Sequence, residues 1–244
     1  MCKKILLACF VLVSFVIMSG SVLAIPNGAN FTEIKTEYGS TSHSPEGHSA
    51  YGGNVTEMDV DGFTVTAAWQ GYFGNVSGTI DLADASGNIL YNWSGLATAD
   101  GEVYVANQSS VTWSGVRCYN LTVGNITDNV TALESYFNIN SSDTDGIDET
   151  FALNNHAGFT TAGTSFGSGE CSNTQLLNNT GGAAFDEVMI KAVTENIPVY
   201  VAILSDDTPG FDGETHDFEM MVPEDGHDGD TTPTTYYFYA ELDA

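Results

Sequence analysis

Basic residues are scarce in this chain. Five Lys and Arg stand against 32 Asp and Glu, which gives a formal net charge of −27 at pH 7. Nucleic acids and anionic membrane surfaces are bound through clustered Lys and Arg, and they repel a surface of this charge. The composition therefore predicts no nucleic-acid partner. It suits an acidic extracellular protein, one adapted to high salt, or one that binds divalent cations.

Motifs of known enzyme classes are also missing. The sequence contains no G-x-S-x-G elbow, no H-E-x-x-H zinc motif and no phosphate-binding glycine loop. Its histidines, His43, His48, His156, His216 and His227, are scattered, and none has obvious metal-ligand spacing to two others. We therefore expect a protein that is not an enzyme. A secreted hydrolase is the less favoured alternative, because triad members and carboxylate pairs need not be close in sequence.

A long apolar run occurs once, at the N-terminus. Lys3 and Lys4 precede the apolar run Ile5–Met18, and small neutral residues follow up to Ala24. This layout predicts a signal peptide over residues 1–24, with the mature chain starting at Ile25. The alternative is an uncleaved anchor, but the run is short for a span of about 20 residues. Cleavage would remove two of the five basic residues and no acidic one, which takes the net charge to −29. We expect no membrane span after cleavage and an extracellular or cell-surface location.

Cysteine is rare, and the count supports export. Cys2 and Cys9 lie in the expected signal peptide, which leaves Cys118 and Cys171. An even pair in an oxidising compartment predicts a disulfide, and closing this long loop would stabilise the fold by about 4 kcal/mol. The alternative is a metal or redox pair, which the absence of C-x-x-C spacing and of a neighbouring histidine disfavours.

Glycosylation sequons are the most specific signal. The chain has ten N-x-Ser/Thr matches, whereas its content of Asn, Ser and Thr predicts roughly four by chance. In the strand pattern around it, Asn92 is out of phase with Tyr91 and Trp93, which places it on the solvent face. N-glycosylation is predicted at Asn30, Asn54, Asn75, Asn92, Asn107, Asn120, Asn125, Asn129, Asn140 and Asn178.

Apolar residues alternate with polar ones between Gly62 and Cys118. The segments Phe63–Trp69, Val76–Leu82 and Ile89–Trp93 have this period of two, with glycine-rich breaks between them. Such a pattern predicts strands with one buried face, and this stretch is expected to form the sheet on which the rest is built. The tryptophans are expected in the core: Trp69, Trp93 and Trp113.

The C-terminal part returns to strand patterns after one helical segment. Val199–Leu204 is apolar on both faces, which predicts a central strand. Val130, Leu133 and Phe137 have helical spacing, with Thr127 or Asp128 as the expected N-cap. The sequence thus predicts an all-β fold of sandwich-like antiparallel sheets with one short helix near residues 127–137. The remaining strands are expected at Val188–Val193, Asp217–Val222 and Thr235–Leu242.

The expected organisation has three parts. Residues 1–24 form the signal peptide, residues 25–53 a polar extended arm, and residues 54–244 a β-rich domain. The arm is indicated by its polar, Gly- and Ser-rich composition. Two sub-parts of the domain that meet near residues 140–150 remain an alternative.

Acidic loops suggest bound cations. Ser141–Glu149 matches the calcium-loop motif at Asp143, Asp145 and Gly146, but the twelfth position of the motif is Ala152 rather than Glu. Two further acidic turns follow Ser205 and Pro223, where oxygen ligands for Ca²⁺ gather. The alternative is that all three are solvated turns of an acidic protein. The candidate metal ligands are Asp143, Asp145, Asp148, Asp206, Asp207 and Asp212.

Several stretches resemble a group of secreted archaeal cell-surface proteins of uncharacterised function. The likeness spans nearly the whole chain after Ala24. It implies a cell-surface or extracellular setting and carries over no catalytic residue. The stretches are WQGYFGNVSG (69–78), LYNW (90–93), GEVY (101–104), WSGVRC (113–118), DETF (148–151), DDTPGFDG (206–213), DFEMMVPEDG (217–226) and YYFYAEL (236–242).

These observations together predict a secreted, N-glycosylated structural or interaction protein of the archaeal cell surface. It would be a component of an envelope, a sheath or an extracellular filament. Its expected partners are cell-surface proteins or glycans, or further copies of itself in an assembly. A carbohydrate-binding module or a Ca²⁺-dependent adhesion module is the alternative, with exposed Trp or Tyr side chains as the sugar platform.

Overall fold

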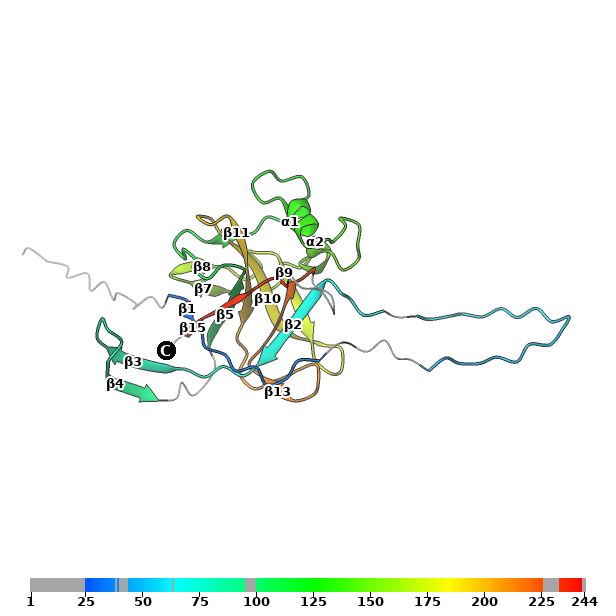
Figure 1. Cartoon of the computed structure of the whole chain (residues 1–244), viewed down its shortest axis with the longest axis horizontal. Coiled ribbons are helices and arrows are strands. Elements are labelled where there is room, and N and C mark those ends of the chain that lie inside the picture. Colours follow the sequence, from blue (N-terminus) through cyan, green and yellow to red (C-terminus); the bar gives the residue numbers. More distant parts are fainter. Residues whose placement is uncertain are drawn as a thin grey trace, which may run out of the picture.

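An antiparallel sheet of seven strands forms the centre of the molecule (Figure 1). The computed structural model describes residues 25–37, 39, 44–62, 64–94, 100–225 and 233–242. The expected signal peptide, His43, His227, Asp228 and Asp230 lie outside these residues. Six strands follow one another in space: β1 (Asn27–Gly28), β15 (Tyr237–Leu242), β5 (Gly101–Ala106), β11 (Ile197–Ile203), β10 (Ala183–Ala192) and β6 (Arg117–Cys118). The seventh strand, β9 (Asn173–Leu177), pairs with β10 beside β6.

Both faces of this sheet are buried, and β11 shows why. Successive side chains of a strand point to opposite faces. Val199 and Val201 belong to the buried cluster on one face, whereas Tyr200 and Ala202 belong to the cluster on the other. Because β11 pairs with β10 on one side and β5 on the other, the prediction of a central strand is confirmed.

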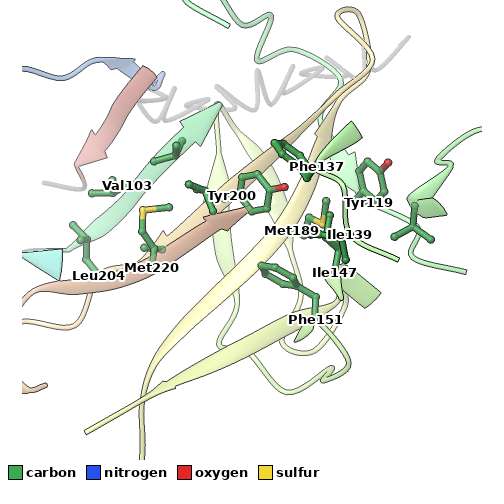
Figure 2. Close-up of a cluster of buried hydrophobic side chains, with 14 residues drawn as sticks. Val103, Tyr119, Phe137, Ile139, Ile147, Phe151, Met189, Tyr200, Leu204 and Met220 are labelled. Atoms are coloured by element: carbon green, nitrogen blue, oxygen red, sulfur yellow. The ribbon is translucent and has the colours of Figure 1, made fainter. Parts of the chain in front are cut away.

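A second, two-stranded sheet packs over one face of the central sheet. Met189 and Tyr200 of the central sheet belong to the same buried cluster as Met220 of the second sheet (Figure 2). Phe137, at the end of one short helix, and Ile147, in another, extend this cluster. Stacked antiparallel layers of this kind confirm the predicted all-β, sandwich-like architecture. The elements of this layer are β2 (Trp69–Gly74), β14 (Phe218–Pro223), α1 (Val130–Tyr136) and α2 (Ile147–Thr150).

The other face is covered by a small hairpin and a loop. The hairpin is formed by β7 (Phe159–Thr161) and β8 (Thr164–Phe166). The loop brings in Trp113, whose ring centroid lies 5.0 Å from that of Tyr104 and 5.2 Å from that of Tyr239. Trp113 is therefore a core residue, as predicted, and Trp69 packs half-buried against the first core.

The predicted disulfide is present. Cys118 at the end of β6 is bonded to Cys171, which is buried just before β9. The bond joins two segments that both border β10, so it fixes one edge of the central sheet.

Helix α1 lies inside the predicted range but begins one residue later than expected. Its N-cap is Asn129, whose side-chain oxygen accepts a hydrogen bond from the backbone N–H of Ala132 at 3.1 Å. Asp128 does not cap the helix because Arg117 and Lys191 occupy its carboxylate. Helix α2 was not predicted, since a single turn is too short to show a periodic pattern.

The N-terminal part of the chain differs most from expectation. Among the described residues between 29 and 68 there is no helix or strand, so the expected strand Phe63–Trp69 reduces to its last residue. Extended segments leave the body there and return to β2 (Figure 1). The turn is at Tyr51, whose carbonyl accepts from Asn54 N–H at 3.2 Å. The sheet on which the rest is built comes mainly from later strands.

Two further strand pairs of the described residues lie outside the central sheet and the layers that cover it. They are β12 (Thr208–Pro209) with β13 (Thr215–His216), and β3 (Thr79–Ala83) with β4 (Ile89–Ser94). Among the described residues, none of the helices is both long and apolar enough to span a bilayer.

Candidate functional site

The β3–β4 hairpin projects from the body of the molecule (Figure 1). It forms a two-stranded sheet of its own, and the described residues pair no further strand with it. Its turn is tightly held, because Asp84 Oδ1 accepts hydrogen bonds from the N–H groups of Ser86 at 2.8 Å and Asn88 at 2.9 Å. Gly87, with φ of 81°, supplies the left-handed residue that the turn requires. The hairpin is therefore preorganised.

One face of this hairpin is apolar and open to solvent. Ile80 lies opposite Trp93 and Leu82 opposite Tyr91, so these four side chains share a face. Their exposed fractions are 40%, 51%, 50% and 58%, respectively. We call these four residues the hairpin face. The predictions that Trp93, Ile80 and Leu82 belong to the core are therefore wrong, because no described layer covers this face, whereas Val76, before the hairpin, does pack partly buried against the core.

The opposite face of the hairpin is polar at Asp81 and Asn92 and apolar near the turn, where Ile89, 56% exposed, pairs with Ala83. Asp81 lies opposite Asn92, whose Nδ2 donates to Asp81 Oδ1 at 2.5 Å. Asn92 is exposed, as expected from its phase relative to Tyr91 and Trp93. A glycan at this sequon would extend away from the hairpin face.

The sequon asparagines lie at the surface. None of the ten is buried, and seven are fully exposed. In Asn120, Asn125 and Asn178 the side-chain oxygen accepts from the backbone N–H two residues later, at 2.8 to 3.0 Å. This Asx turn uses the oxygen and holds the side chain in one orientation. The fold thus exposes seven of the predicted glycosylation sites, whereas Asn107, Asn125 and Asn178 are partly buried.

Three carboxylates meet between α1 and α2. One oxygen from each of Glu134, Asp148 and Glu149 lies within 4.8 Å of the others. Glu134 is buried, and its Oε1 accepts from Ile147 N–H at 3.1 Å. Burial first, and then the neighbouring carboxyl of Asp148, raise the pKa of Glu134 to about 7. A cluster of oxygen ligands in this arrangement could hold a hard cation such as Ca²⁺.

The structure gives the predicted ligands of the Ser141–Glu149 loop different surroundings. Asp148 joins the three-carboxylate cluster. Asp143 accepts from Asn140 N–H at 2.9 Å within the turn, and Asp145 Oδ2 accepts from Thr66 Oγ1 at 2.5 Å. These two aspartates hold the loop and its neighbouring segment, and within the described residues neither forms a three-ligand group with Asp148.

The predicted ligands after Ser205 are also spread along their turn. Asp207 has a backbone φ of 47° and donates its N–H to Asp217 Oδ1 at 3.2 Å. Asp212 lies 3.0 Å from Nε2 of His216, and Asp206 is exposed nearby. In the described part of the chain, Asp206, Asp207 and Asp212 do not come together as a three-ligand group. Calcium binding at either loop stays a prediction.

Two buried polar groups are closed off by the fold. Tyr104 O–H lies within 3.3 Å of side-chain oxygens of Glu102 and Glu241. The backbone N–H of Ala162 donates a hydrogen bond to Glu241 Oε2 at 3.0 Å. His156 is buried, with Nδ1 at 2.5 Å from its neighbour's carbonyl and Nε2 accepting from Cys171 N–H at 3.0 Å. Both groups therefore act in the packing of β5, β15 and the disulfide loop.

Comparisons with models of known protein families, with curated proteins and with solved structures find no significant match.

Sequence reasoning missed two members of the carboxylate cluster and the exposure of the hairpin face. The signal for Glu134 was present, since it stands four residues after Val130 in the predicted helix and so shares its inward face. Glu149 gave no such signal, because its proximity to Glu134 depends on how α2 packs. An alternating pattern likewise indicates two different faces of a strand but does not say which layer covers the apolar one.

Proposed function

We propose that this chain is a secreted, N-glycosylated structural or interaction protein of the archaeal cell surface, a component of an envelope, sheath or filament. The observation that carries the proposal is the hairpin face, an uncharged apolar surface on a hairpin that projects from the body (Figure 1) and whose turn is held by hydrogen bonds. Exposed apolar patches of this kind mark contact sites on soluble proteins.

Three further features support the same setting. The ten sequon asparagines lie at the surface, the disulfide suits an oxidising compartment, and the acidic surface suits an environment rich in cations. The resemblance to secreted archaeal cell-surface proteins points in the same direction. Each of these supports the location, whereas the hairpin face supports the contact role.

The test is to find where the native protein resides and what it carries. We expect mass spectrometry of purified cell envelopes to detect the chain from Ile25 onward, with glycan mass on several sequon peptides. Immunogold electron microscopy should place it at regular positions on the outer surface. A chain found unglycosylated, or found only inside the cell, would contradict the proposal.

A carbohydrate-binding role is the second candidate. Tyr91 and Trp93 are exposed neighbours with ring centroids 4.8 Å apart and planes at 64°. Aromatic rings stack on the apolar faces of sugars, although this angle gives a bent rather than a flat platform. Loss of polysaccharide binding in Trp93→Ala, with unchanged folding, would favour this role over the structural one.

A further inference from the structure

The hairpin face requires a cover that the described chain does not supply. Isolated two-stranded hairpins are marginally stable in water, and the apolar face of a sheet normally packs on another layer. The turn at Asp84 and the Asp81–Asn92 contact hold the strands in register without such a layer. The geometry is therefore that of a docking element fixed before it meets its partner.

Charge narrows the choice of partner. Within residues 79–94 the charged side chains are Asp81, on the opposite face, and Asp84, in the turn. A face without carboxylates offers no ion pair to a basic partner. It is, however, a surface on which two molecules of net charge −27 can meet without burying like charges.

We propose that the hairpin face packs against the hairpin face of a second copy of this chain, related by a two-fold axis. This inference rests on the proposed function and names the partner. In a two-fold contact the same patch is used on both molecules, so one self-complementary apolar face is sufficient. The two hairpins would form a two-layer sheet about 10 Å thick. Its interior would contain Ile80, Leu82, Tyr91 and Trp93 of both copies.

The position of the hairpin agrees with this arrangement. It stands away from the acidic body (Figure 1), so pairing by its tip region keeps the two bodies apart. Asn92 and Asp81 would face outward from the two-layer sheet, where a glycan meets no obstacle. Such a contact therefore tolerates both the charge and the predicted glycosylation.

The size of the contact sets its strength. Four side chains from each copy make a small interface, which by itself gives a weak dimer. Many copies held side by side at a surface would raise the effective concentration and make the contact persistent. Because the bodies repel each other, NaCl should strengthen the dimer, whereas an ionic interface would be weakened by salt.

The first test measures self-association of the secreted, glycosylated protein by sedimentation equilibrium over a range of protein and NaCl concentrations. We expect a monomer–dimer equilibrium that shifts toward dimer as NaCl rises. Trp93→Ser should raise the dimer dissociation constant roughly ten-fold or more, as for central interface aromatics. Tyr136→Ser, at another exposed aromatic residue on α1, is the matched control and should leave it unchanged.

A second test locates the contact without relying on a loss of binding. Since Cys118 and Cys171 are bonded to each other, an added cysteine is the free thiol of the described chain. A short bis-maleimide should cross-link Ile80→Cys into dimers, whereas Thr79→Cys, on the opposite face of the same strand, should not react in this way. Equal cross-linking of the two variants would overturn the proposed face.

Other outcomes also decide the question. A protein that stays monomeric at every concentration and salt level would overturn the inference. A monomer that binds polysaccharide through Trp93 would overturn it in favour of the carbohydrate role. Envelope fractionation tests the proposed function separately, because a monomeric protein found in the envelope leaves the function intact while refuting the dimer.

Discussion

Lys191 and Asp128 form a buried ion pair, with Nζ of the lysine 2.5 Å from Oδ1 of the aspartate. Arg117 binds the same carboxylate through two nitrogens, at 2.5 and 2.7 Å. Two of the three basic residues that follow Ala24 thus converge on one side chain. The group connects β6, β10 and the start of α1, so the scarce positive charge of the chain is used inside the fold.

Replacing Asp128 with Asn should destabilise the protein by about 3–5 kcal/mol, because Lys191 would remain buried without a counter-charge. Burial alone would raise the pKa of Asp128, but hydrogen bonds from Arg117 and Lys191 outweigh it and lower the pKa. Its contribution is therefore present above the ordinary carboxyl pKa and is lost as the pH falls below about 4.

Urea unfolding at several pH values measures both effects. Asp59→Asn, at an exposed position in the extended segment before β2, is the control, and equal stability of the two variants would contradict the prediction.

Glu187→Gln should remove a loss of stability that begins as the pH rises above about 4.3. Glu187 is fully buried in β10, where Oε2 accepts from Met221 N–H at 3.0 Å and Oε1 has no hydrogen-bond partner. Burial raises its pKa well above the usual value. The folded protein therefore loses stability as the pH rises from about 4.3 toward this raised pKa, by up to about 1.4 kcal/mol per pH unit.

Thermal melting of wild type and variant from acidic through neutral to alkaline pH tests this. The two curves should diverge as the pH rises, because glutamine keeps the acceptor for Met221 but cannot ionise. Glu57→Gln, at an exposed position, should follow the wild type. Parallel curves for Glu187→Gln and wild type would contradict the prediction.

Much of the central sheet was predictable from local pattern. The segment Val199–Leu204 is apolar at every position, and only a strand buried on both faces accommodates that. The helix near residues 127–137 and the Cys118–Cys171 bond were predictable for similar reasons, from spacing and from an even count. In each case the residues of the segment itself, by their apolar pattern or their count, were sufficient for the prediction.

The exposure of the hairpin face and the partners of the acidic side chains were not predictable, because they depend on segments distant in the sequence. Trp93 and Trp113 have similar sequence neighbours, since each follows a polar residue and precedes Ser-Gly, yet only Trp113 meets a second layer. The carboxylate cluster depends on α2 packing beside Glu134, which no local pattern encodes. Asp145 could not be assigned either, since its partner Thr66 lies 79 residues away.

The two tryptophans should therefore respond differently to truncation. Trp113 is 7% exposed, and Trp113→Ala should cost about 3–5 kcal/mol through the cavity it leaves against Tyr104 and Tyr239. Trp93 is 51% exposed, so Trp93→Ala should cost less than about 1 kcal/mol in dilute monomeric protein. Guanidinium unfolding of both variants is the measurement. A cost for Trp93→Ala that matches that of Trp113→Ala would show that the hairpin face is covered within the monomer.

Ca²⁺ should stabilise the protein most at alkaline pH. The raised pKa of Glu134, about 7, means that its contribution to stability is present below the ordinary pKa and is lost as the pH rises through about 7. Above that pH Glu134 is ionised beside the other two carboxyl groups of the cluster, and an ionised Glu134 is the form that binds a cation. Calcium at 100 times its dissociation constant would add about 2.7 kcal/mol.

Melting curves at acidic and alkaline pH with chelator, with millimolar Ca²⁺ and with NaCl of matched ionic strength measure this. Glu134→Gln should abolish the Ca²⁺-specific rise, whereas Asp207→Asn, in the turn after Ser205, should retain it. Equal rises with Ca²⁺ and NaCl would mean that salt only screens the acidic surface, and the prediction would be wrong.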